Sequence, residues 1–214
     1  EDPGVEALKN TGGGDTEWGI RVVIGGHSHD WYKEPGDPGA GGVAYVGSFG
    51  ASSDTPAFVF EDNQANGAEK YTAEAITHET GHTLGLVHDG TSSLEYYEGH
   101  GSGVTGWAPI MGVGYYKELV QWSKGEYPDA NQPQDDLAII TTNNGFDYRS
   151  DDHGSISAEA DPLNPLGGAI LSAEGIIERN TDVDYFYLTT GAGTVTIDVQ
   201  PFYRSPNLDI LATL

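Results

Sequence analysis

The chain has 214 residues, of which 33 are Asp or Glu and 9 are Lys or Arg, so its formal net charge is −24. Nucleic acids and anionic membrane surfaces are bound by clustered Lys and Arg, so this balance argues strongly against both partners. There is no cysteine, so any metal site must be built from His, Asp or Glu. No apolar run approaches the roughly 18 residues that span a bilayer, so we expect no membrane insertion.

Composition also indicates a folded chain with many loops. The 31 glycines are about twice the usual share of roughly 7%. The 12 Tyr, 6 Phe and 4 Trp, together with several β-branched runs, can build a core, which argues against disorder. The length allows one large domain or two small ones.

The first 150 residues alternate short strands with helices. We expect a short helix near residues 5–10, a buried strand over 21–24, and further strands over 43–46 and 57–60. Residues 68–84 are the best predicted helix, and Gly85 follows where a helix C-terminus is expected. A second, shorter helix is predicted over 135–140, with acidic residues at its N-terminus.

The pattern changes after residue 150. Residues 150–155 read as a linker, and strands are predicted over 183–188 and 194–199. We therefore place a domain over 1–150 and a linker with an all-β region over 151–214. A β-sandwich needs roughly 100 residues and only about 60 remain, and the chain has no starting Met, so we expect a fragment truncated in both parts.

The chemically informative run lies on the predicted helix and reads H-E-T-G-H-T-L-G-L-V-H from residue 78 to residue 88. His78 and His82 are four residues apart, so they project from one helix face and can reach one metal ion. Gly85 lets the chain leave the helix sharply, so that His88 can return as a third ligand. Three protein ligands leave one position open, as in catalytic zinc sites, and Glu79 can point toward a water there.

This run, followed by the only methionine, Met111, in residues 107–112, resembles the metzincin zinc peptidases. The resemblance implies that Met111 forms the Met-turn beneath the zinc ion. Asp89 directly after His88 and the run over residues 42–47 are similar to the adamalysin (reprolysin) branch. In that branch such a run is an edge strand that pairs with the substrate backbone, which assigns substrate binding to Val43, Ala44, Tyr45 and Val46.

Most of the chain is more similar still to secreted bacterial metallopeptidases of adamalysin type that carry a pre-peptidase C-terminal domain. Residues 175–186 and 205–210 resemble pieces of that β-sandwich. The resemblance implies an α/β (α+β) fold: a twisted mixed sheet with the active helix beneath it, then a partial all-β sandwich module. It also implies a secreted, monomeric protein.

The resemblance further implies a zinc metalloendopeptidase that hydrolyses peptide bonds of protein or peptide substrates through a metal-activated water. Zn²⁺ would be held by His78, His82 and His88, with Glu79 as the general base. One alternative is a catalytically silent binding or adhesion module that keeps the metal for structure. Another is that this fragment is inactive although its parent is a peptidase.

Several other residues have two interpretations. Some metzincins place a metal-binding Tyr two residues after the Met-turn Met, but this chain has Val113 there. Tyr115 and Tyr116 could line the cleft, although packing is the favoured role. Solvated loops or a charged linker are favoured over metal or catalytic roles for the following residues: His27, His29 and Asp30; His100; and Asp151, Asp152 and His153. Asp182 and Asp184 are candidate Ca²⁺ ligands, without an EF-hand spacing.

Overall fold

The computed structural model describes residues 4–34, 36, 38–204 and 207–214. The chain divides into two compact units, which we call unit 1 (residues 1–145 and 199–214) and unit 2 (residues 146–198). The mixed helix and strand content confirms the predicted α+β fold class. No helix among the described residues is both long and apolar enough to span a bilayer.

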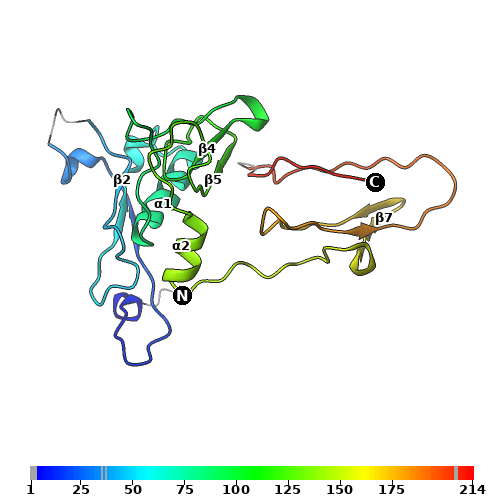
Figure 1. Ribbon diagram of the computed structural model, residues 1–214, viewed down its shortest axis with the longest axis horizontal. Coiled ribbons are helices and arrows are strands. Elements are labelled where there is room, and N and C mark those ends of the chain that lie inside the picture. Colours follow the sequence, from blue (N-terminus) through cyan, green and yellow to red (C-terminus); the bar gives the residue numbers. More distant parts are fainter. Residues whose placement is uncertain (1–3, 35, 37, 205–206) are drawn as a thin grey trace. The chain divides into compact units, whose positions relative to one another are not determined.

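Unit 1 is built around a mixed three-stranded sheet with the order β1-β3-β2 (Figure 1). Strand β1 (Val22–Ile24) runs parallel to the central β3 (Ala57–Val59), and β2 (Gly42–Val43) runs antiparallel to it. Helix α1 packs against β3 and β2. The buried side chains of β3, Ala57 and Val59, lie at the centre of this core.

Two of the strand predictions in unit 1 differ from the structure. The strand over 21–24 was expected to be buried, but Val23 and Ile24 are exposed because β1 is an edge strand and α1 packs on β3 and β2. The strand over 43–46 is regular only as far as Val43. Residues 44–46 leave the ladder, and the side chains of Tyr45 and Val46 face solvent.

Helix α1 (Glu69–Thr83) confirms the predicted helix over 68–84. It ends in a Schellman arrangement: the Gly85 amide donates to the His82 carbonyl at 2.9 Å, and the Leu86 amide donates to the Gly81 carbonyl at 3.1 Å. Gly85 has a φ of +102°, a left-handed conformation that side chains with a Cβ rarely adopt. This turn reverses the chain at the C-terminal end of α1, as the sequence predicted.

The rest of unit 1 is rich in loops. Strands β4 (Trp107–Pro109) and β5 (Leu119–Gln121) pair in parallel, and α2 (Asp136–Asn143) follows, with the Asp135 side chain accepting from the Ala138 amide at its N-terminus. The expected helix near 5–10 is the 3-10 helix η1. The 3-10 helices of unit 1 are η1 (Val5–Leu8), η2 (Ser28–Asp30), η3 (Glu61–Asn63) and η4 (Gly103–Thr105).

The last residues of the chain return to unit 1. The Asn207 side chain accepts from the Val120 amide at 2.7 Å and donates to the Val120 carbonyl at 2.6 Å, so it brackets one residue of β5. Residues 205 and 206, within the run that resembles the sandwich module, lie outside the described residues.

Unit 2 contains two two-stranded sheets. Strand β6 (Asp161–Pro162) pairs in parallel with β9 (Phe186–Tyr187), and β7 (Asn164–Gly167) pairs antiparallel with β8 (Ile170–Ser172), after the 3-10 helix η5 (Ser157–Glu159). The strand predicted over 183–188 is therefore reduced to β9. The prediction over 194–199 is wrong: these residues pair with no other strand in the part of the chain that the structure describes, and Val195, Ile197 and Val199 are about half exposed.

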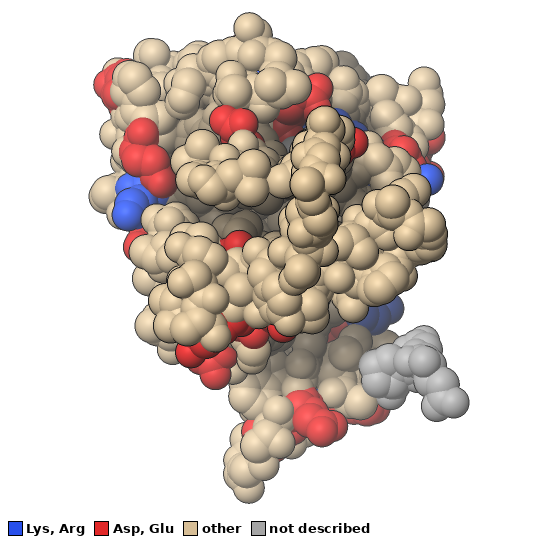
Figure 2. Space-filling model, turned by 90° about the vertical axis from the view of Figure 1, so that its right-hand side faces the viewer, with Lys and Arg blue, Asp and Glu red and all other residues tan. Residues whose placement is uncertain are grey.

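The acidic composition is visible on the surface. On the face drawn in Figure 2, Asp and Glu side chains are scattered widely, with few Lys or Arg side chains between them. Acidic side chains therefore outnumber basic ones on this face.

The α1 turn yields the first prediction. Gly85→Ala should lower the free energy of unfolding of unit 1 by about 1–3 kcal/mol, because alanine must adopt a strained φ there. A Cβ at this position would meet only Ile139 Cγ2, at 3.8 Å, so backbone strain and not crowding is the cause. All four tryptophans lie in residues 1–145, so Trp fluorescence during denaturant unfolding reports on unit 1. Unchanged stability would contradict the strain.

Candidate metal centre

Three histidines meet at the C-terminal end of α1. His78 and His82 are one turn apart on the helix, and His88 comes back to them after the Gly85 turn. Their ring centroids are 4.7–5.3 Å apart, and one ligand nitrogen from each lies within 4.8 Å of the others. The structure thus brings together the three ligands that the sequence spacing indicated.

Each imidazole has its Nδ1 tied to a different acceptor. His78 Nδ1 lies 2.8 Å from the Ile110 carbonyl oxygen, and His82 Nδ1 lies 2.9 Å from the Leu86 carbonyl oxygen. His88 Nδ1 lies 2.9 Å from Oε1 of Glu95. Carbonyl and carboxylate oxygens only accept, so each Nδ1 carries the proton and each Nε2 presents its lone pair.

Burial favours the uncharged form of the two rings on the helix, His78 and His82. It lowers the pKa of His78 to about 3, with a smaller contribution from His82, and it also lowers the pKa of His82. The Nε2 atoms of His82 and His88 face each other at 3.0 Å. Two lone pairs at this distance repel unless a cation lies between them, so the three-nitrogen set fits a metal ion such as Zn²⁺.

Glu79 lies beside this group and is buried, with 6% of its surface exposed. Its Oε2 has no hydrogen-bond partner within the described part of the chain. Burial raises the pKa of Glu79 to about 8. A cation at the three histidines would favour the carboxylate and lower this pKa again.

Met111 lies under the helix that carries the ligands. It is fully buried, and its Sδ is 2.6 Å from the position that a Cβ on Gly81 would occupy. Gly81 stands between the two helical histidines in sequence, so its missing side chain lets Met111 approach this end of α1. The Asp89 amide donates to the Met111 carbonyl at 2.8 Å, which joins the segment after His88 to the same turn.

The remaining sequence candidates in unit 1 lie in different environments. Val43 is partly buried in β2, whereas Tyr45 and Val46 expose 73% and 56% of their surface. Tyr115 packs on Tyr71, with a centroid separation of 5.0 Å, and burial raises its pKa. Tyr116 is 83% exposed. A place in the cleft for either tyrosine stays a prediction.

The other histidines do not join the three-histidine group. His27 caps η2 by accepting from the His29 amide and contacts the Asn63 side chain at 3.2 Å. His100 lies 3.1 Å from the Tyr97 hydroxyl. Among the described residues, none of these histidines belongs to a group of three or more ligand side chains. Their interpretation as loop residues is therefore favoured.

Sequence reasoning missed Glu95 and Tyr96, which both contact His88. The Tyr96 ring centroid is 4.3 Å from that of His88, and burial raises its pKa to about 12, with contributions from Glu95 and Glu79. These residues lie in a glycine-rich region with little periodicity. Only the path of the folded chain shows which of its side chains reach the metal site.

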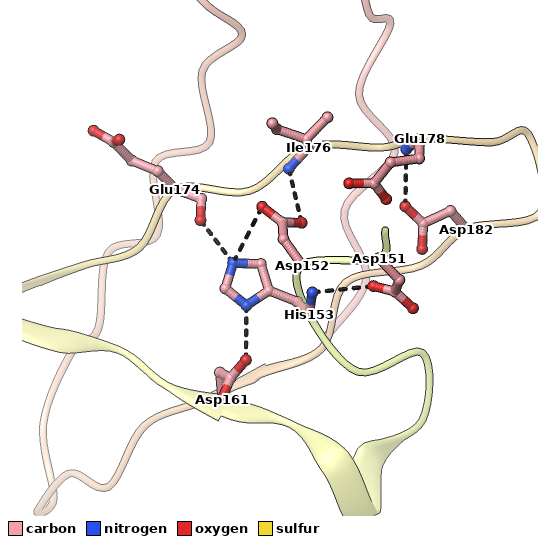
Figure 3. Close-up of polar contacts among 8 residues, drawn as sticks. All are labelled: Asp151, Asp152, His153, Asp161, Glu174, Ile176, Glu178 and Asp182. Atoms are coloured by element: carbon pink, nitrogen blue, oxygen red, sulfur yellow. Dashed lines mark hydrogen bonds and ion pairs between the residues drawn. The ribbon is translucent and has the colours of Figure 1, made fainter. Parts of the chain in front are cut away.

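Acidic side chains of unit 2 form a second polar cluster (Figure 3). Asp151, Glu178 and Asp182 could offer three ligand atoms within 4.8 Å, as could Asp151, Asp152 and Asp184. Carboxylate oxygens are the donors that Ca²⁺ prefers. Calcium binding by Asp182 and Asp184 stays a prediction.

His153 belongs to this cluster and is not part of a free linker. Its Nδ1 lies 2.7 Å from Oδ2 of Asp161, and its Nε2 lies 2.8 Å from the Glu174 carbonyl oxygen (Figure 3). Two acceptors favour the charged ring, and they raise the pKa of His153 to about 9.

The helix–methionine contact can be tested by overpacking. Gly81→Ala should cost about 1–3 kcal/mol in the unfolding of unit 1, because the new Cβ meets Met111 Sδ at 2.6 Å and the Trp122 ring at 3.2 Å. In a chain that already carries Met111→Ala, the same Gly81→Ala substitution should cost less than it does in the parent chain, because the side chain that it meets has been shortened. Additive losses in this double-mutant cycle would show that the two positions do not interact.

The His153 contacts predict a pH effect on unit 2. The raised pKa means that the charged ring stabilises the folded state fully below about pH 6.5, its unfolded value, and that this contribution is lost as the pH rises through about 9. The measurement is an NMR titration of histidine ring protons, assigned by the signal missing in His153→Asn. A midpoint near 6.5 would contradict the network.

Comparison with known families agrees with this site. Residues 32–123 match a reprolysin model described as metallo-peptidase family M12. No curated protein and no solved structure matches the chain significantly. The matched segment is less than half of the chain but includes all three histidines, Glu79 and Met111. The match supports a metallopeptidase, a class that acts on protein or peptide substrates, and the three-histidine group could hold its metal.

Proposed function

We propose that this protein is a zinc-dependent endopeptidase in which His78, His82 and His88 hold the metal and Glu79 is the general base. The observation that carries the proposal is the buried carboxylate oxygen of Glu79, which has no hydrogen-bond partner among the described residues, beside three imidazoles whose ligand nitrogens converge. A structural zinc site is normally closed by four protein ligands, whereas three histidines leave a position open.

A zinc ion bound there supplies a Lewis acid that polarises the scissile carbonyl and makes a water molecule more acidic. The chain itself supplies the proton transfers. Glu79 takes the proton of the attacking water as the new C–O bond forms, and then gives it to the departing amine nitrogen as the C–N bond breaks. The three Nδ1 contacts hold the imidazoles in place during these steps.

An extended substrate can lie along the β2 edge of the sheet and add a strand to it. Strand β2 is the outer strand on that side, and Tyr45 and Val46 beyond it are exposed. A Cβ on Gly42 would lie 2.5 Å from Cγ of Glu79, so the edge passes directly beside the general base. This placement supports assigning substrate contact to Val43, Ala44, Tyr45 and Val46.

Secretion is part of the proposal and rests on the resemblance to secreted peptidases. The net charge of −24 is consistent with secretion into salty surroundings. Ions there screen the repulsion between the acidic side chains beyond about 8 Å at physiological salt, and beyond a shorter distance at higher salt.

Replacing the general base tests the function. Glu79→Gln should retain stoichiometric zinc but lower casein hydrolysis about 10²–10⁴-fold, because the amide cannot accept the water proton. The matched control is Glu69→Gln, an exposed acid on the same helix, which should cleave like the parent chain. Activity of the parent should disappear with a zinc chelator and return with added zinc. A parent chain that binds zinc but cleaves nothing would favour the catalytically silent module.

A further inference from the structure

The three metal-binding histidines differ in what holds them. His78 and His82 lie on a helix, and each gives its Nδ1 proton to a backbone carbonyl. His88 lies beyond the helix end, and its Nδ1 contacts a charged side chain, Oε1 of Glu95. The third ligand is therefore the one whose orientation depends on another side chain.

Backbone hydrogen bonds tie the loop that carries Glu95 to Asp89, the residue that follows His88. The Tyr97 amide donates to the Asp89 carbonyl at 2.7 Å, and the Thr91 amide donates to the Leu94 carbonyl at 2.8 Å. A Cβ on Gly90 would collide with the carbonyl oxygens of Leu94 and Glu95, so only glycine lets the two arms of the loop approach this closely. The backbone of the loop thus fixes the position from which the Glu95 side chain extends.

The neighbouring residue holds the face of the same ring. The Tyr96 ring lies against His88 with a centroid separation of 4.3 Å and an interplanar angle of 43°. Glu95 therefore restrains one edge of the imidazole while Tyr96 covers one face. Together they leave Nε2 directed at the other two histidines.

We propose that Glu95 is a positioning residue for the metal: it fixes the tautomer and the orientation of His88, with Tyr96 as the adjoining wall. This inference rests on the proposed metal site. A carboxylate on the far nitrogen of a ligating imidazole makes that ligand more basic and holds its direction, and losing such a partner typically weakens metal binding about 10–100-fold. The side chain of Glu95 is 68% exposed, so its carboxylate adds little buried surface to the folded chain.

The test is the zinc dissociation constant of the 214-residue chain, measured by competition with a chromophoric chelator. Glu95→Ala should weaken zinc binding about 10–100-fold. Glu95→Gln, which keeps an acceptor oxygen but loses the charge, should weaken it less. The matched control, Glu98→Ala, removes an exposed acid three residues away and should stay within about twofold of the parent.

Unfolding of the metal-free variants, followed by Trp fluorescence, separates positioning from folding. Glu95→Ala and Glu98→Ala should unfold alike without zinc and differ only in the stabilisation that zinc adds. Equal zinc affinities for these two variants would overturn the proposal, as would a loss in Glu95→Ala that is matched by metal-free destabilisation.

The outcome is distinguishable from that of the peptidase proposal. If the parent binds zinc but does not cleave casein, the proposed function fails while the affinity difference still supports Glu95. If cleavage depends on Glu79 but Glu95→Ala binds zinc like the control, only the role of Glu95 fails. Zinc binding that survives His82→Ala would overturn both.

Discussion

The arrangement of unit 1 depends on holding three imidazoles close together, with their ligand nitrogens converging. Burial removes the proton that would otherwise fill the lone pair, as the depressed pKa of His78 shows. An acceptor on each Nδ1 then decides which nitrogen faces the shared space. With both Nε2 lone pairs directed at this space, the 3.0 Å approach of His82 and His88 is favourable when a cation joins them.

The fold satisfies this constraint with short-range devices. The Schellman end of α1 reverses the chain at Gly85, and the carbonyl of Leu86, in that reversal, accepts from His82. The carbonyl of Ile110, next to Met111, accepts from His78, so the turn under the helix both packs against α1 and orients a ligand. The same backbone segments therefore build the core and aim the histidines.

The side chains of the site range from buried to partly exposed. His82 and Glu79 are buried in α1, whereas His88 keeps 27% of its side chain exposed and relies on Glu95 and Tyr96. The exposed edge formed by Tyr45 and Val46 lies beyond β2, the strand that passes beside Glu79. In the proposed peptidase, substrate access falls where the fold is least regular, as is usual for functional loops on a fixed scaffold.

The sequence by itself determined α1, its end at Gly85 and the grouping of the candidate ligands His78, His82 and His88, because helical periodicity and a left-handed glycine are local properties. It also predicted the positions of β1, β3 and α2. Only the tertiary structure decided that β1 is an exposed edge, that residues 194–199 form no strand, and that Glu95 and Tyr96 reach His88. The first two outcomes depend on which strand finds a partner, and strand pairing is set by contacts between segments that are distant in sequence. The third depends on how a loop closes, and this loop has no repeating sequence pattern from which its path could be predicted.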